Sequence, residues 1–595
     1  MSVVTQIKEA AVKAISHLYG INLQTQDIQV NATKPEFEGD YTVVLFAFVK
    51  QLKKSPDALG KELGDTLLAQ NPALFTSYNL IKGFLNLCIS DSYWLHFVER
   101  EYTNTGFGNS KSNGQRVMVE YSSPNTNKPL HLGHLRNNFL GRSIAEILKA
   151  NGYEVSKTCI VNDRGIHICK SMVAWQLFAN GAIPADTNTK GDHFVGDYYV
   201  KFNNEYKKQV AELIAAGKST EEAEKEAPVM KAAQQMLFDW EAGKPEVIAL
   251  WQLMNSWVYA GFDATYQRIG SDFDKTYYES KTYLLGKDLV ESGLAKGVFF
   301  QKADGSVWID LTADGLDEKL VRRKDGTSVY ITQDIGLAEQ KQKEFNAGQS
   351  IYVVGDEQNY HFKVLKLICQ KLGLPSADGI FHLSYGMVEL PTGKMKSREG
   401  TVVDADDLVE EMVAIAKQKT EELGKVKDFT EEELTDLYDI LGLGALKFFL
   451  LRVDPKKKMV FNPEESIDFH GFTGPFIQYT HARIKSILRK SGMAQPPANN
   501  NLPKANLLPL EKELSIQLEM FPAILQDAAI EHDPSKVAIY AFNLARIFNS
   551  FYAGHSIGNA ENEEKKILRL QLSQLTARVI KNGMNVLGIR VPERM

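Results

Sequence analysis

Short apolar runs alternate with amphipathic stretches through the middle of the chain, and this alternation constrains the fold more than any other feature of the sequence. The strand-like runs read "RVMVEY", "SKTCIVND", "SIYVVGD" and "FHLSYGMVEL". Between them, apolar residues recur at helical spacing. This order is typical of a parallel sheet whose strands are joined by crossover helices. We therefore predict a central α/β domain.

At 595 residues the chain is too long for a single hydrophobic core. Residues 1–110 mix helix-like and strand-like segments and end in a Gly- and Asn-rich loop, which predicts a small α+β N-terminal domain. The α/β domain is expected at residues 111–405, with a helical insertion at about 182–257 that lacks strand-like runs. Residues 406–595 are almost wholly helix-like and predict an all-α bundle.

Composition narrows the class of protein. The four cysteines are scattered without a CxxC pair, so neither a disulfide scaffold nor a cysteine zinc site is expected. The first residues lack the apolar core of a signal peptide, and no apolar run reaches membrane-spanning length, so we expect a cytoplasmic protein. The net charge of −6 gives no global attraction to nucleic acid, and an RNA partner would have to bind local basic surfaces.

A pair of histidines marks the change from strand to helix in "VEYSSPNTNKPLHLGHLRN", residues 119–137. The spacing of the apolar residues that follow predicts a helix starting near His131 and His134, at the carboxyl end of a strand, where open α/β sheets bind nucleotides. The N–H groups and dipole of a helix start favour phosphate, Gly133 permits close approach, and the imidazoles could donate to a phosphoryl group. The alternative is a capping and packing pair; zinc lacks further ligands.

A second basic segment, "ELPTGKMKSREGTVV" at residues 389–403, follows a strand-like run. Its glycines bracket Lys394, Met395, Lys396 and Arg398. Such a loop could close on a triphosphate and stabilise a departing pyrophosphate. By itself the segment is better explained as a charged surface turn. Its occurrence on the same α/β domain as the histidine pair favours a nucleotide site.

HLGH and GKMKSREG resemble HIGH and KMSKS, the two signature motifs of class I aminoacyl-tRNA synthetases. The frame around HLGH resembles that of the arginyl-tRNA synthetases, and the resemblance covers essentially the whole chain. Further segments that carry it are "EFEGDYTVVLFAFVKQLKKSPDALGKEL", "GDHFVGDYYVKFN", "SVYITQDIGLA", "VVGDEQNYHFKVL", "TGPFIQYTHARIKSILRK" and "LGIRVPERM". The resemblance implies a Rossmann-like catalytic domain, an N-terminal domain that binds the tRNA elbow, and a C-terminal anticodon-binding bundle.

The resemblance also implies an arginine–tRNA ligase. ATP and L-arginine would give arginyl-adenylate and pyrophosphate, and arginine would then pass to the 3'-terminal adenosine of tRNA(Arg). Mg²⁺ is expected to accompany ATP on its phosphate oxygens, without a dedicated protein site. Members of this family are mostly monomers. The second lysine of KMSKS aligns with Ser397, and Lys128 is expected to contact the ATP phosphates in its place, with Lys396 as the competing candidate.

Carried over by motif, the arginine pocket would consist of Glu120, Asn125, Tyr330, Asp334 and Gln358. A guanidinium group is a planar fork of donors, which acceptors placed for bidentate bonding and aromatic contacts recognise best. Glu120 and Asp334 are expected to share the recognition of charge on the ammonium and guanidinium groups of the substrate. Roles for Asn162 and Asp163 stay open.

The predicted RNA contacts lie in the two outer domains. "YTHARIKSILRK" places Arg483 and Lys490 on one helical face, and Tyr479 could stack on an exposed base. In the N-terminal domain the candidates are Phe37 and Tyr41. A solvated basic helix face is the alternative. Two other functions are weighed as well: a catalytically silent RNA-binding relative, and a nucleotidyltransferase using HxGH, which would not need the helical bundle.

Overall fold

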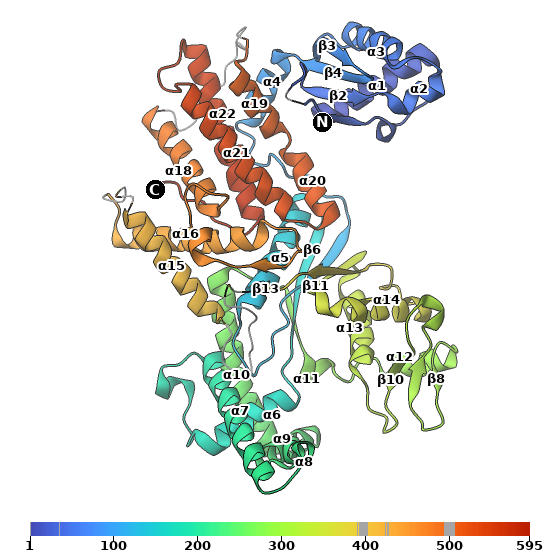
Figure 1. The fold of residues 1–595 in the computed structure, drawn as a ribbon, viewed down its shortest axis with the longest axis vertical. Helices are drawn as coiled ribbons and strands as arrows, with labels where there is room; N and C mark the ends of the chain where they lie inside the picture. The colour runs from blue at the N-terminus through green and yellow to red at the C-terminus, as the bar shows by residue number, and fades with distance from the viewer. Residues whose placement is uncertain are drawn as a thin grey trace.

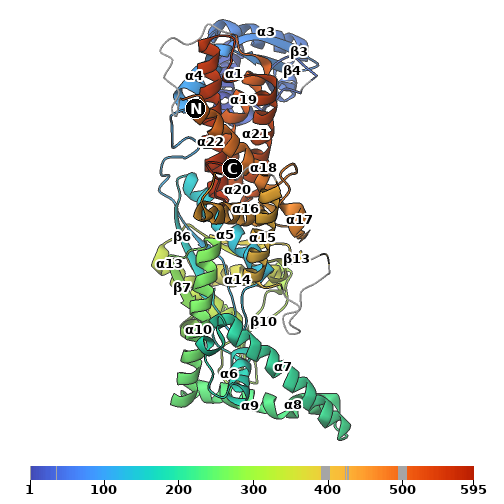
Figure 2. The ribbon, with the colours of Figure 1, turned by 90° about the vertical axis from the view of Figure 1, so that its left-hand side faces the viewer.

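The computed structural model describes residues 2–34, 36–389, 391, 403–422, 424, 428–492 and 506–595. The molecule is elongated, with the N-terminal domain and the helical insertion at opposite ends and the parallel sheet between them (Figures 1 and 2). The C-terminal helices pack between the N-terminal domain and the sheet. Among the described residues, no helix is long and apolar enough to cross a membrane.

The N-terminal domain is a four-stranded antiparallel sheet of order β1-β2-β4-β3, covered by helices. Gly60 and Gly64 let one helix lie close to the sheet, because a Cβ at Gly64 would stand 2.7 Å from the Tyr78 ring. The elements are α1 (Val3–Tyr19), β1 (Val30–Ala32), β2 (Tyr41–Val44), α2 (Phe46–Leu52), α3 (Pro56–Gln70), β3 (Phe75–Ile81), β4 (Phe84–Ile89) and α4 (Asp91–Glu101).

The central sheet has five parallel strands in the order β12-β11-β5-β6-β7, which confirms the predicted parallel-sheet fold. The chain runs outward from β5 to β7 and then returns to the other side of β5, so the strand order reverses between β5 and β11. A crevice opens at such a point, beyond the carboxyl ends of the strands. The strands are β5 (Arg116–Glu120), β6 (Glu154–Val161), β7 (Lys275–Tyr278), β11 (Gln349–Gly355) and β12 (Ile380–Tyr385).

Helices connect the strands of this sheet, as the alternation in the sequence predicted. Helix α5 is buried on most of its sides, and the residues of the predicted apolar face, Leu140, Ile144, Ile147 and Leu148, are all buried. A small antiparallel sheet of β8, β9 and β10, which the sequence pattern did not reveal, follows α12. The elements are α5 (Leu132–Ala150), α6 (Ile166–Phe178), α11 (Glu279–Thr282), α12 (Lys287–Ala295), β8 (Phe300–Gln301), β9 (Val307–Ile309), β10 (Lys319–Arg322), α13 (Tyr330–Phe345), the 3-10 helix η4 (Asp356–Gln358) and α14 (Asn359–Leu372).

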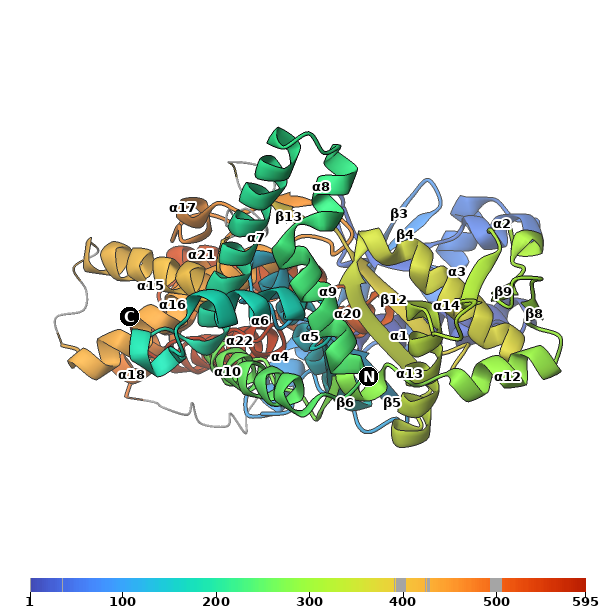
Figure 3. The same cartoon turned by 90° about the horizontal axis from the view of Figure 1, so that it is seen from below.

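The insertion between β6 and β7 is helical, as expected. Figure 3 views this end of the molecule, with α7 to α10 nearest the viewer. Gly191 and Gly261 sit where α7 and α10 meet, and a Cβ at Gly191 would stand 2.1 Å from the Trp257 carbonyl oxygen. The helices are α7 (Gly191–Ala215), α8 (Thr220–Glu226), α9 (Pro228–Glu241) and α10 (Pro245–Ile269). The exact domain boundaries, expected near residues 110 and 405, remain predictions.

The C-terminal helices are tied to the sheet by a buried arginine of α5. Arg136 is fully buried and donates to the carbonyl oxygens of Gly386, Pro455 and Lys457 at 2.8, 3.1 and 2.8 Å. It thereby supports the pairing of β13 with β14. The elements are β13 (Val388–Glu389), α15 (Ala405–Glu422), α16 (Glu431–Leu451), β14 (Met459–Val460), α17 (Pro463–Ser466), α18 (Gly474–Lys490), α19 (Pro509–Glu519), α20 (Phe521–Glu531), α21 (Ser535–Gly554) and α22 (Glu563–Val586).

Candidate active site

The two histidines of HLGH cap the start of α5, where the sequence placed them. His131 is the N-cap residue, and its Nδ1 accepts the Gly133 N–H at 3.1 Å. His134 Nδ1 accepts the His131 N–H, also at 3.1 Å, and the two rings lie 3.9 Å apart. Because each Nδ1 accepts a hydrogen bond, the proton of each neutral imidazole is on Nε2.

Burial and the nearby Lys128 ammonium keep both imidazoles neutral. Burial is the larger cause and Lys128 the smaller in lowering the pKa of His131 to about 3. Burial, with His131 and Lys128 adding to it, likewise holds the pKa of His134 far below its usual value. At neutral pH both side chains therefore present an uncharged Nε2–H donor. Lys128 and His131 also line a common pocket of about 170 Å³ that faces α7.

The residues predicted to bind ATP in the second motif, Lys394, Met395, Lys396 and Arg398, lie outside the described residues. The chain is described again from Val403, directly beside the histidine motif. Leu132 N–H donates to the Val403 carbonyl at 3.2 Å, and Ala405 N–H donates to the Leu130 carbonyl at 3.0 Å. His131 and Asp404 thus form an antiparallel bridge. The C-terminal end of the second motif, at Val403, is therefore hydrogen-bonded to the first motif.

A pocket of about 440 Å³ opens at the carboxyl ends of β5 and β11. Four of the five residues predicted to bind arginine line it: Glu120, Asn125, Asp334 and Gln358. The fifth, Tyr330, starts α13 with 72% of its surface exposed and is not part of this lining. The structure thus brings Glu120 of β5 together with Asp334 of α13 and Gln358 of η4, which follow it by more than 200 positions in the chain.

One residue of α5 joins this pocket to the histidines. Asn137 Oδ1 accepts the Ser122 N–H at 2.6 Å, and its Nδ2 donates to the Val353 carbonyl at 2.6 Å. Ser122 and Val353 both line the pocket. Asn137 lies one turn after His134, so the pocket wall and the histidine pair are fixed to the same end of one helix.

Lys341, which was not predicted from the sequence, neutralises one of the three acidic groups in the pocket, which are Glu120, Asp334 and Glu357. Its ammonium group forms an ion pair with Glu120, and only 2% of its side chain is exposed. It lies 5.3 Å from the centre of the Tyr277 ring and 5.0 Å from that of the Tyr352 ring. Lys341 follows Asp334 by seven residues, which is two helical turns, so helical spacing could have identified it.

Asp334 and the open candidates Asn162 and Asp163 have different surroundings. Asp334 Oδ2 lies 2.7 Å from His361 Nε2, at the pocket. Asn162 also lines the pocket. Asp163 is buried, and its carboxylate accepts from the Tyr259 hydroxyl at 2.8 Å and from the N–H and hydroxyl of Ser280 at 2.8 and 2.7 Å. Since these donors occupy both carboxylate oxygens, we assign Asp163 a structural role.

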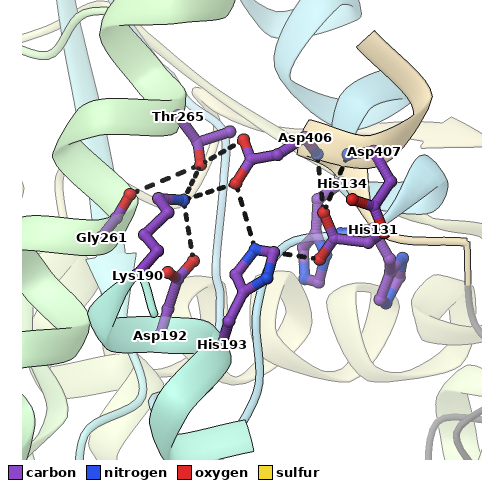
Figure 4. A network of polar contacts seen from close by, with 10 residues as sticks. His131, His134, Lys190, Asp192, His193, Gly261, Thr265, Asp406 and Asp407 are labelled. Carbon is purple, nitrogen blue, oxygen red and sulfur yellow. Dashed lines mark hydrogen bonds and ion pairs between the residues drawn. The ribbon is translucent and has the colours of Figure 1, made fainter. Parts of the chain in front are cut away.

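A cluster of charged side chains lies beside the histidines, between α7, α10 and the start of α15 (Figure 4). Asp192, His193 and Asp406 offer atoms within 4.8 Å of one another, a grouping that could hold a metal ion. Lys190 Nζ, however, donates to Asp192 Oδ2 at 3.1 Å and to Asp406 Oδ2 at 2.6 Å. An ammonium group therefore supplies the positive charge of this cluster.

The predicted RNA contacts of α18 come together on one surface. Tyr479, Arg483 and Lys490 line a pocket of about 330 Å³ together with Tyr552 and Met595. The Arg483 guanidinium lies over the Tyr479 ring, 4.8 Å from its centre, and donates to Asn549 Oδ1 at 2.7 Å. A cation and aromatic rings around an open pocket suit an unstacked base.

The two candidates of the N-terminal domain differ in exposure. Phe37 is exposed on the surface. Tyr41 is a correction: only 4% of its surface is exposed, because alternation along β2 points Tyr41 and Val43 into the domain core. It cannot stack on RNA from that position.

Comparison with known proteins assigns the class and then the family. Residues 101–462 match the family model described as "tRNA synthetases class I (R), catalytic domain", residues 477–595 the "DALR anticodon binding domain", and residues 5–89 the "Arginyl tRNA synthetase N terminal domain". The fold, the histidine motif at the helix start and these matches define a class I aminoacyl-tRNA synthetase.

Full-length relatives give the family. The chain is 53% identical to the arginine–tRNA ligase of Amoebophilus asiaticus and 52% identical to that of Bacteroides fragilis, over all of each chain. The solved Thermus thermophilus arginyl-tRNA synthetase superimposes with a TM-score of 0.78 over 99% of both chains, at 26% identity. The chain belongs to the arginyl-tRNA synthetase family, and it is an arginine–tRNA ligase.

Proposed function

We propose that the 440 Å³ pocket binds L-arginine and that the adjoining face of α5 binds ATP, so that adenylate formation occurs between them. One observation carries this assignment: a neutral histidine pair, each ring with its proton on Nε2, caps the helix whose Asn137 holds the pocket wall. The donors and the amino-acid pocket are therefore positioned by one rigid element.

In the first step a carboxylate oxygen of arginine forms a bond to the α-phosphorus of ATP. The bond between that phosphorus and the bridging oxygen breaks, and pyrophosphate leaves. We assign His131 and His134 as Nε2–H donors to the phosphoryl oxygens, whose charge grows in the transition state. Neutral donors suit this task, because they stabilise the developing charge without binding ground-state ATP through a full positive charge. Lys128 is our candidate for binding the departing pyrophosphate, together with Lys394 and Lys396 of the second motif.

Recognition of arginine needs an acid near each of its two cationic ends. We assign Glu120 to the α-ammonium group, because β5 leads directly into the histidine segment and the ammonium lies next to the reacting carboxylate. Asp334 on α13 then serves the guanidinium group, with Gln358 and Asn125 as further polar partners. Lys341 offsets one of the three negative charges of Glu120, Asp334 and Glu357, which leaves two for the two cationic groups of the substrate.

In the second step the arginyl group passes to a ribose hydroxyl of the 3'-terminal adenosine of tRNA(Arg), and AMP leaves. We propose that the α18 pocket of Tyr479, Arg483 and Lys490 binds anticodon bases and that Phe37 contacts the tRNA elbow. Mg²⁺ would accompany ATP on phosphate oxygens, since Lys190 already supplies the cation of the acidic cluster. We expect a cytoplasmic monomer, with its four cysteines unpaired.

Arginine-dependent charging of bulk tRNA, and ATP–pyrophosphate exchange with and without tRNA, test the proposal. Lys128→Ala should lower exchange while leaving the KM for arginine unchanged, and Lys396→Ala is its matched comparison. If only Lys396→Ala lowers exchange, the assignment of Lys128 is wrong. A wild-type chain that binds tRNA but charges it with no amino acid would favour the catalytically silent relative instead.

A further inference from the structure

The charged cluster beside the histidines has no part in the mechanism above, although it meets the reacting region from three helices. Lys190 precedes α7, and Asp192 and His193 lie in its first turn. Thr265 belongs to α10, while Asp404 and Asp406 stand at the start of α15. Figure 4 shows the cluster on one side of His131 and His134.

Nearly every polar atom of the α15 start is used in these contacts. Asp404 Oδ1 accepts the Asp406 N–H at 2.8 Å and the Asp407 N–H at 3.2 Å, so it caps α15. Its Oδ2 lies 3.3 Å from His193 Nε2. Asp406 Oδ2 lies 3.1 Å from the same nitrogen and 2.6 Å from Lys190 Nζ. Asp406 Oδ1 accepts from the Thr265 hydroxyl at 2.9 Å.

The centre of the cluster is closely packed. Lys190 Nζ has three acceptors, since it also donates to the Thr265 hydroxyl at 2.5 Å. Asp192 is fully buried, and a Cβ at Gly261 would stand 2.3 Å from its Oδ1, so only glycine lets α10 approach α7 this closely. Any shift of α15 against α7 would break several of these contacts together.

The same turn of α15 is bonded to the histidine motif through the backbone. The hydrogen bonds of Leu132 with Val403 and of Ala405 with Leu130 lie on either side of Asp404. The side chain of Asp404 thus faces His193 while its backbone pairs with His131. The cluster is therefore joined to the helix start that presents the imidazoles.

Burying several charges is a poor way to gain stability, because desolvation offsets much of the attraction between the partners. Bonded polar networks do, however, fix a single arrangement of the elements they join. Here both carboxylate oxygens of Asp404 and of Asp406 have partners, whereas Asp192 Oδ1 has none among the described residues. Catalysis needs such fixing, since a misplacement of about 1 Å can cost about 100-fold in rate. The place of this cluster beside the histidines fits that need.

We propose that Lys190 and His193 are positioning residues for adenylate formation: through Asp404 and Asp406 they hold the start of α15 against residues 130–132, and so fix the imidazoles relative to the helical insertion. This inference rests on the donor role proposed for His131 and His134. Neither Lys190 nor His193 lines the 440 Å³ arginine pocket. Their loss should therefore lower the rate of activation without changing the binding of arginine.

The test compares three variants in ATP–pyrophosphate exchange, with rates expressed per active site by titration of adenylate. His193→Leu removes the donor, whereas His193→Gln places an amide N–H near the position of Nε2. Lys208→Met, on the exposed side of the same helix, is the matched control. We expect His193→Leu to lower kcat about 10-fold to 100-fold with an unchanged KM for arginine, His193→Gln to recover most of the rate, and Lys208→Met to match the wild type.

Wild-type kcat per active site in His193→Leu would overturn the inference, and so would equal losses in the Leu and Gln variants. If the His193→Leu variant does not fold, Lys190→Met can be compared with the wild type and with Lys208→Met in the same assay. His134→Ala, measured in the same assay, separates the two proposals. If His134→Ala slows exchange and His193→Leu does not, only the positioning role is wrong. If His134→Ala has no effect, the donor role of His134 is wrong, and so is the positioning role of Lys190 and His193 that rests on it.

Discussion

The two roles of His134 can be separated by substitution, because its ring nitrogens face different partners. Nδ1 accepts the His131 N–H at 3.1 Å and so caps α5, whereas Nε2 carries the proton assigned to catalysis. His134→Asn retains an acceptor near the position of Nδ1 and loses the distal donor. His134→Gln retains a donor near the position of Nε2 and loses the cap. His134→Ala loses both.

The expected magnitudes differ between the two roles. Removing one preorganised donor from a transition state lowers kcat about 10²-fold to 10³-fold, or about 2.7–4 kcal/mol. Losing a helix cap costs about 0.5–2 kcal/mol of stability. We therefore expect His134→Asn to slow adenylate formation as much as His134→Ala while unfolding like the wild type. His134→Gln should be the more active of the two polar variants and the less stable one.

Single-turnover formation of arginyl-adenylate, with saturating arginine, ATP and tRNA, measures the donor role, and thermal unfolding measures the cap. Since the pKa of His131 is about 3 and that of His134 is also far below 6.5, neither imidazole should titrate between pH 6 and 8. A near-wild-type rate for His134→Asn would refute the donor assignment. A histidine-dependent loss of rate as the pH falls from 7 to 6 would refute the neutral state.

Four further outcomes are expected. Asp334→Asn should raise the KM for arginine at least 10-fold and that for ATP little, in exchange kinetics, because the variant loses the charge assigned to the guanidinium. Lys341→Met should lower the thermal midpoint by leaving the buried Glu120 carboxylate without its cation, and adding Glu120→Gln should restore much of it. Additive losses would contradict the pairing. The hydrogen bond to Asp406 raises the pKa of His193 above 6.5. The stability that protonated His193 contributes should therefore be present below pH 6.5 and be lost as the pH rises through the raised pKa. Thermal unfolding measured from pH 6 to 9 should show this loss in the wild type and not in His193→Gln. Arg483→Ala should weaken tRNA binding several-fold in a filter assay, with an unchanged KM for arginine.

Local patterns in the sequence are enough to predict several features of the fold. Alternating apolar runs predicted the parallel sheet, and the apolar spacing after His134 predicted where α5 begins. Both signals are local, because the spacing of apolar residues that distinguishes a strand from a helix is set by residues close together in the sequence. The family resemblance then named Glu120, Asn125, Asp334 and Gln358, which the structure brings into one pocket.

Tertiary packing decided what periodicity could not. Tyr41 was predicted to contact RNA, and Lys341 was not predicted as the partner of Glu120, whereas packing buries Tyr41 and brings Lys341 to that carboxylate. Lys190 reaches Asp406 across 216 positions of the chain. Such contacts depend on how α7, α10 and α15 pack together, and a charged residue carries the same local signal whether it faces water or a buried partner. The sequence thus determined the elements and the chemistry available to them, and the packing of helices decided which charges meet.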